Sequence, residues 1–200
     1  PFAEICRREV GFIRSAVSAK TKAEWESANE KLVKYENITD KIEYEIASYL
    51  NEVTKGDISA FSALRIKSMY RVIGELESIG DSGEAIGRMM KRALDHGKTF
   101  DEEMIKRLDR MLDLLDVAFG AMTENLSSPA LFLKDITNAE DAEYNINEYR
   151  NRLREEHIVN IEKDDYNYQT GVFYIDIVQE LEKMGDFIIN ISQSLLEKND

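Results

Sequence analysis

The seven residues Glu75–Asp81, ELESIGD, recur as ELEKMGD at Glu180–Asp186, with five identities at an offset of 105. Apolar residues spaced three and four apart extend the match on both sides. They are Met69, Val72, Leu76, Ile79, Ile86 and Met90, matched by Tyr174, Ile177, Leu181, Met184, Ile191 and Leu195. Because this spacing marks one face of an amphipathic helix, the sequence predicts two copies of one long helix.

The helix that precedes each copy is repeated as well. Its apolar stripe comprises Leu32, Tyr35, Thr39, Ile42 and Ile46, which return at an offset of 107 as Ala139, Ala142, Ile146, Tyr149 and Leu153. Between turn and capping signals, six helical segments are predicted at about 2–20, 22–54, 58–95, 100–125, 130–162 and 166–198. Thr99 and Glu102 have the spacing of a capping box for the fourth segment. We therefore expect an all-α chain of two pseudo-repeated three-helix bundles, 1–97 and 98–200, which together form one domain.

Composition narrows the function. The net charge of −13 argues against nucleic acid, whose binders carry a basic surface, and is compatible with binding cations. A single cysteine, Cys6, excludes an internal disulfide. No uncharged apolar run approaches the ~20 residues of a membrane span. The chain starts at Pro1 rather than at a methionine, so we expect a piece of a longer protein in which a membrane segment lies upstream.

Pairs of acidic residues one helical turn apart recur at matching places in both halves. The candidate metal ligands are Glu36, Asp40, Glu77 and Asp81 in the first half, and Glu143, Asn147, Glu182 and Asp186 in the second. Each pair lies one residue from an apolar stripe, at the border between core and solvent, so two facing helices can bring four such side chains together. With 39 acidic residues in the chain, the alternative is that these pairs are ordinary solvated helix faces.

The candidate ligands restrict the metal. Carboxylate and amide oxygens without nearby His or Cys suit a hard cation, namely Mg²⁺, Ca²⁺, Mn²⁺ or iron. Gly80 and Gly185 stand one residue before the aspartates and would let a bound ion, or equally a neighbouring helix, approach the backbone. The Glu-x-x-His motif of a di-iron bundle is absent, because Ala93 precedes His96 by three residues and Arg154 precedes His157 by three. No catalytic triad, phosphate loop or dinucleotide motif is present, so we do not expect an enzyme.

Two three-helix halves that carry Glu-x-x-x-Asp on paired helices resemble the PhoU family of phosphate-uptake regulators. The resemblance covers nearly the whole chain. The segment YNYQTGVFYIDIVQELEKMGD, residues 166–186, looks most like the version fused behind the membrane domain of bacterial sodium/phosphate cotransporters. This resemblance implies a regulatory domain, on the cytoplasmic side of the bacterial inner membrane, that modulates phosphate uptake.

The resemblance also implies multinuclear metal clusters on the acidic motifs, although Asn147 replaces an acid in the second one. The partners implied are the transporter membrane domain of the same polypeptide or other phosphate-uptake machinery, with a homodimer left open. Two alternatives remain at this point. The chain would otherwise be a free-standing regulator of phosphate signalling, or a helical interaction scaffold that binds no metal.

Overall fold

A computed structural model describes residues 1–128, 133–162 and 167–196, and all regular structure in these ranges is α-helical. The helices are α1 (Phe2–Val17), α2 (Lys22–Thr54), α3 (Ala60–Asp95), α4 (Glu102–Ser127), α5 (Thr137–Glu162) and α6 (Tyr168–Leu196). The predicted all-α class with six helices is thereby confirmed.

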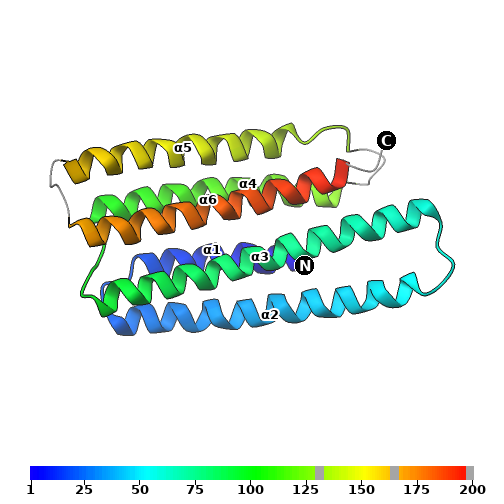
Figure 1. Ribbon diagram of the computed structural model, residues 1–200, viewed down its shortest axis with the longest axis horizontal. Coiled ribbons are helices and arrows are strands. Elements are labelled where there is room, and N and C mark those ends of the chain that lie inside the picture. The colour runs from blue at the N-terminus through cyan, green and yellow to red at the C-terminus, as the bar shows by residue number, and fades with distance from the viewer. Residues whose placement is uncertain (129–132, 163–166, 197–200) are drawn as a thin grey trace.

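The helices lie nearly parallel to one long axis, with α1–α3 on one side and α4–α6 on the other (Figure 1). The α2–α3 connection lies at one end of the molecule, and the last turn of α5 and the first turn of α6 lie at the opposite end. The two sides meet where α3 packs on α6 and α1 packs on α4. This grouping is the one expected of two three-helix units, whereas the superposition of the units remains a prediction.

The core follows the repeated apolar stripes. Ile79 and Ile86 of α3 and Leu181 and Met184 of α6 are buried completely or nearly so. Burying one such side chain contributes about 1.5–3 kcal/mol, which explains why helices this long associate along their whole length. Cys6 is also fully buried, and its thiol lies 3.4 Å from the carbonyl oxygen of Leu76.

Two helix starts differ from the prediction. Asp101, rather than Thr99, caps α4, and its Oδ1 accepts a hydrogen bond of 2.7 Å from the backbone of Met104. Helix α5 begins at Thr137, not at residue 130, and residues 133–136 are not helical. Asp135 offers a local alternative to helix because its carboxylate accepts from the Thr137 amide at 3.3 Å. Residues 130–132 of that prediction lie outside the described ranges, as do residues 166, 197 and 198 of the sixth predicted segment.

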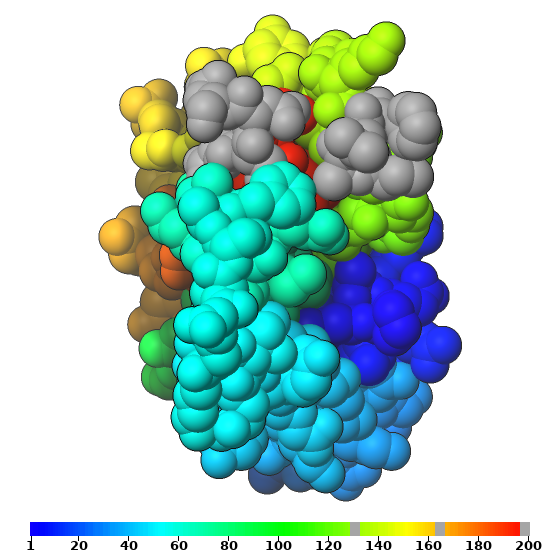
Figure 2. All heavy atoms as spheres, turned by 90° about the vertical axis from the view of Figure 1, so that its right-hand side faces the viewer, coloured from blue at the N-terminus to red at the C-terminus, as the bar shows by residue number. Residues whose placement is uncertain are grey.

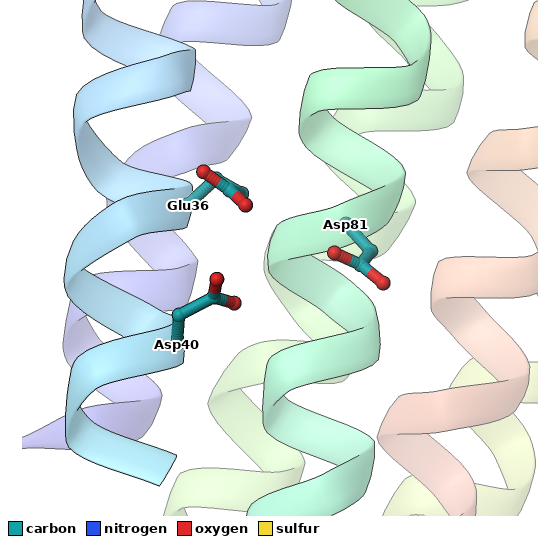
Figure 3. Close-up of side chains that lie close together, drawn as sticks. All are labelled: Glu36, Asp40 and Asp81. Carbon is teal, nitrogen blue, oxygen red and sulfur yellow. The ribbon is translucent and has the colours of Figure 1, made fainter. Parts of the chain in front are cut away.

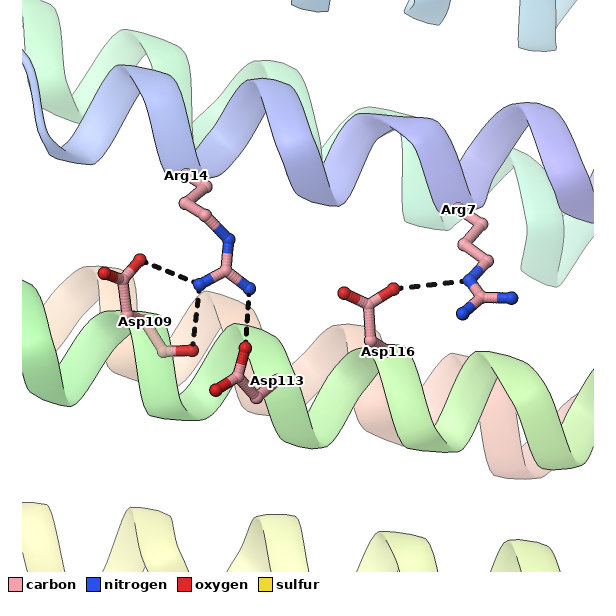
Figure 4. A network of polar contacts seen from close by, with 5 residues as sticks. All are labelled: Arg7, Arg14, Asp109, Asp113 and Asp116. Carbon is pink, nitrogen blue, oxygen red and sulfur yellow. Dashed lines mark hydrogen bonds and ion pairs between the residues drawn. The ribbon is translucent and has the colours of Figure 1, made fainter.

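Ion pairs join α1 to α4 across the outer edge of the interface between the two sides (Figure 4). Arg14 donates to Asp109 Oδ1 and to Asp113 Oδ1 at 2.9 Å each, and Arg7 reaches Asp116 at 3.3 Å. These side chains are a third to a half exposed, and pairs of that kind contribute only about 0–1 kcal/mol each. They fix the register of α1 on α4 more than they stabilise it.

The longest helices form the α2–α3 hairpin, with 33 and 36 residues. Helix α2 alone spans about 50 Å at 1.5 Å per residue. The hairpin therefore extends past the ends of α4, α5 and α6 (Figure 1). Despite their length, none of the described helices carries an apolar stretch sufficient to cross a bilayer.

Candidate metal centre

Three of the candidate ligands converge between α2 and α3. Glu36 and Asp40 project from successive turns of α2 toward Asp81 on the facing side of α3 (Figure 3). One carboxylate oxygen from each of these residues lies within 4.8 Å of the other two. None of the three forms an ion pair with a lysine or arginine in the described part of the chain.

The three carboxylates repel one another, and the pKa of Glu36 shows this repulsion. The pKa of Glu36 is raised by partial burial and then by the charges of Asp40, Glu84 and Asp81. Glu84 forms an ion pair with Arg88, whereas Asp40 and Asp81 do not have such a partner among the described residues. A cation between the three carboxylates would replace this repulsion with attraction.

Glu77, the fourth candidate ligand of the first half, lies beside this group of three rather than within it. Its pKa is raised by burial, then by the charges of Asp81, Asp40 and Glu43. Ser78 donates a hydrogen bond of 3.5 Å to its carboxylate. Glu77 is therefore electrostatically coupled to Asp81 and Asp40, and Glu43 adds a further acid that the sequence analysis did not single out.

The two supporting glycines lie where helices cross. A Cβ at Gly80 would lie 2.5 Å from the hydroxyl oxygen of Thr39, and one at Gly185 would lie 3.1 Å from Cδ1 of Ile146. Thr39 and Ile146 are themselves related by the offset of 107. The glycines thus let α3 approach α2, and α6 approach α5, which is the second of the two roles considered for them.

The second half holds its acidic residues differently. Asn147 donates to Glu143. The guanidinium of Arg150 donates to Asn147 Oδ1 at 3.3 Å and forms an ion pair of 2.9 Å with Glu182 Oε1. Burial raises the pKa values of Glu182 and Asp186, and the charge of Arg150 lowers both. An internal cation therefore offsets part of the cost of charging these carboxylates.

Arg150 has an acidic counterpart in the first half. The offset of 107 that relates Glu36 to Glu143 and Asp40 to Asn147 relates Glu43 to Arg150. At two of these three positions, the first half is therefore more negative than the second. Within the described ranges, the first half is the one that gathers carboxylates without a basic side chain among them.

A further carboxylate, which the sequence analysis missed, is buried beside this group. Glu9 of α1 is 1% exposed, and neither of its carboxylate oxygens has a hydrogen-bond partner among the described residues. Burial, followed by the charge of Glu36, raises the pKa of Glu9 to about 8. A buried polar group without a partner is uncommon, so Glu9 indicates that this side of the acidic group is incomplete as it stands.

Glu9 has room because of a glycine. A Cβ at Gly83 of α3 would lie only 2.9 Å from Glu9 Oε2. Two signals in the sequence point to this pair. Glu9 occupies a position of the apolar stripe between Cys6 and Ile13, and Gly83 is the one residue of the α3 stripe without an apolar side chain. An acid and a glycine at positions that are otherwise apolar break the pattern of a packed core, and such departures are typical of functional sites.

The donor set of the first half fits a hard cation. Carboxylate oxygens from Glu36, Asp40 and Asp81 are suitably close, and Glu77 lies beside them. Glu9 offers a further oxygen on the buried side of Glu36. Mg²⁺, Ca²⁺, Mn²⁺ and iron all accept such a set of oxygen ligands. The arrangement can bind an ion and tie α2 to α3, which is a structural role more than a catalytic one.

Comparison with solved structures identifies the fold. The chain matches PhoU from Pseudomonas aeruginosa with a TM-score of 0.83 and 14% identity, over 98% of this chain and 91% of that one. The fold is that of PhoU. The chain also matches the phosphate transport system regulatory protein PhoU from Streptococcus pneumoniae, with a TM-score of 0.70 and 17% identity, over 98% and 90% of the two chains.

The PhoU resemblance expected from the repeated motifs is confirmed at the level of the fold. No protein-family model matches the sequence, and no curated protein sequence matches it. The identities of 14% and 17% to the two PhoU structures are low enough that the likeness is one of architecture. The particular kind of PhoU-like protein has to be argued from this chain's own residues.

Proposed function

We propose that this chain is a regulatory PhoU-like domain that modulates phosphate uptake and binds a hard cation through its first-half carboxylates. The observation that carries the proposal is the convergence of Glu36, Asp40 and Asp81 between α2 and α3 without a basic partner. The supporting context is a PhoU fold, since one of the matched proteins is a phosphate transport system regulatory protein. A bound ion would set the distance between α2 and α3. A partner protein that contacts both helices would bind differently when this distance changes.

The finer proposal is that the domain works on the cytoplasmic side of the bacterial inner membrane, as part of a sodium-dependent phosphate transporter. It rests on the resemblance of residues 166–186 to the cotransporter-fused version of the family. In this role the domain controls a transporter that a separate membrane domain provides, and it catalyses no reaction itself. The competing role is that of a free-standing regulator of phosphate signalling.

The contacts of Arg150 favour a second half that binds no metal. The guanidinium of Arg150 contacts both Asn147 and Glu182, in the position that a bound metal cation would otherwise occupy. We therefore place the metal in the first half only, and we assign the second half the role of a preformed support for α6. A scaffold that binds no metal in either half is the outcome to be excluded.

The test measures uptake of radiolabelled phosphate in separate strains. One carries the native gene, one carries the gene without the segment for residues 1–200, and one carries the gene with Asp81→Asn. Native cells should lower uptake when external phosphate is abundant, whereas the deletion and Asp81→Asn should weaken that response. Asp186→Asn, the matching change in the second half, is the control and should leave the response in place. Equal responses in all four strains would refute a role in phosphate uptake.

A further inference from the structure

The tip of the α2–α3 hairpin, residues 53–69, carries apolar side chains that the fold does not bury. Phe61 is 60% exposed and Leu64 is 49% exposed, and Val53, Ile58 and Met69 are exposed as well. The tip extends past α4, α5 and α6 along the long axis (Figure 1). In the view onto that end of the molecule, the tip forms the cyan surface nearest the viewer (Figure 2). Exposed apolar side chains gathered in this way mark an interaction site.

The tip also differs in charge from the rest of the protein. It contains Lys55, Arg65 and Lys67 against a single acid, Asp57, which amounts to +2. Since the whole chain carries −13, the remainder carries −15. Lys55 pairs with Glu52 just outside the tip, whereas Arg65 and Lys67 are exposed and form no ion pair with a described residue. The basic charge of the tip is therefore available to a partner.

We propose that this tip docks on an anionic lipid surface. Basic side chains beside exposed aromatic and aliphatic ones are typical of segments that lie in the lipid headgroup region. Arg65 lies over the ring of Phe61, 5.8 Å from its centroid, so a cation and an apolar ring are presented together. An acidic protein would otherwise be repelled by an anionic membrane, and the tip provides the complementary charge.

The acid-free start of α3 keeps the acidic residues farther along this helix away from such a surface. Residues 58–74 contain no aspartate or glutamate, and the next acid along α3 is Glu75. Fifteen helical residues separate Ala60 from Glu75, which corresponds to about 22 Å. This distance exceeds the Debye length of about 8 Å at physiological ionic strength. The repulsion between Glu75 and the lipid headgroups is therefore screened when the tip makes contact. On α2, the acid next to the tip is Glu52, and its charge is paired with Lys55.

A cavity beside the tip favours lipid over an acidic peptide as the partner. Its volume is about 360 Å³, and its apolar lining includes Met69, Val72, Ile73, Leu126, Leu133 and Leu195. Arg65 and Ser68 also line it. An apolar cavity with a guanidinium at its edge suits an acyl chain attached to an anionic headgroup. An acidic peptide would leave that apolar lining without a matching group.

The test is co-sedimentation of the full chain with vesicles of phosphatidylglycerol and phosphatidylcholine, compared with vesicles of phosphatidylcholine alone. The protein should bind the anionic vesicles and release them as salt is raised. Removing one basic side chain near the surface should weaken partitioning about fivefold, so Arg65→Gln with Lys67→Gln should weaken it roughly 25-fold. Phe61→Ser should weaken it about tenfold through lost apolar contact.

Two matched controls keep the test specific. Lys91→Gln removes a basic charge from an exposed position near the other end of α3, and Val117→Ser removes an exposed apolar side chain from α4. Both should bind like the unmodified protein. Circular dichroism and melting temperature show whether each variant is folded.

Three results would overturn the proposal. They are no binding to anionic vesicles, equal binding to neutral vesicles, and binding that the tip variants do not change. If Phe61→Ser instead converts a dimer into a monomer in sedimentation experiments without affecting vesicle binding, the tip is a surface between two copies and the lipid proposal is wrong. The inference does not depend on the metal, because the tip lies outside the acidic group and no metal is added to the vesicle assay.

Discussion

Arg150 of α5 forms an ion pair of 2.9 Å with Glu182 of α6, and the repeat places Glu43 at the corresponding position of α2. One half of the molecule thus carries its own cation between its paired helices. The other half has carboxylates at the corresponding positions and no such cation among its described residues. Since like charges on facing helices oppose their packing, the first half is the half whose helix pairing should respond to an added cation.

The first prediction is that a hard cation stabilises the protein through the first half. At a hundredfold excess over the dissociation constant, binding to the folded state contributes about 2.7 kcal/mol, or roughly 5–10 °C in melting temperature for a chain of this size. Asp81→Asn should abolish most of that rise, because it removes one of three converging carboxylates. Asp186→Asn should keep it. Differential scanning calorimetry with Mg²⁺, Ca²⁺, Mn²⁺ and iron in turn measures the effect, and a melting curve that none of them moves would eliminate the metal site.

The second prediction concerns the guanidinium of Arg150, which is added to the first half or removed from the second. Glu43→Arg should supply the first half with the cation that Arg150 supplies to the second, and should therefore reduce the metal-dependent rise. Arg150→Gln should break the partly buried ion pair with Glu182 and remove the charged donor of the hydrogen bond to Asn147. It should lower the melting temperature by about 4–10 °C, since a hydrogen bond to a charged group contributes about 1.5–3 kcal/mol. Thermal unfolding with and without metal distinguishes these effects. Unchanged metal dependence in Glu43→Arg would show that Glu43 lies too far from the ion to matter.

The third prediction concerns pH. The pKa of Glu9 is raised to about 8 in the folded protein by burial, whereas an unfolded glutamate titrates near 4.3. The folded state keeps the proton while the unfolded state loses it, so the free energy of unfolding should fall as pH rises from about 4.5 to 8. Glu9→Gln should flatten this slope and raise the stability at pH 8 by roughly 3–5 kcal/mol. Urea unfolding at several pH values measures both, and an equally steep slope in the variant would assign it to other carboxylates.

The fourth prediction tests the glycine at the crossing of α2 and α3. Gly80→Ala should destabilise the protein by about 1–3 kcal/mol, because its Cβ would lie 2.5 Å from the Thr39 hydroxyl oxygen. Adding Thr39→Ala, which removes the obstructing atoms, should recover part of the loss. Gly74→Ala on the same helix has open space and should stabilise by up to about 1 kcal/mol. Chemical denaturation of the three variants is the measurement, and equal effects of the two glycine changes would contradict the role of close approach.

The sequence alone was sufficient for the architecture. The apolar stripes from Met69 to Met90 and from Tyr174 to Leu195 repeat over six turns, and burying such stripes leaves few arrangements other than a bundle. Helix ends were less predictable. Asp101 and Thr99 are both good capping residues, and the choice between them depends on which amide each side chain reaches, since Asp101 is the one that accepts from Met104.

For the candidate site, the repeated Glu-x-x-x-Asp spacing determined which residues to consider, because period and offset are properties of the chain itself. Only the tertiary structure decided how the acidic residues of the first half differ from those of the second in their contacts. It brings Asp81 to Glu36 and Asp40, places Arg150 on Glu182, and buries Glu9 against Gly83. Each of these contacts joins residues on different helices, and a periodic pattern within one helix specifies which face is buried but not which side chain it will meet.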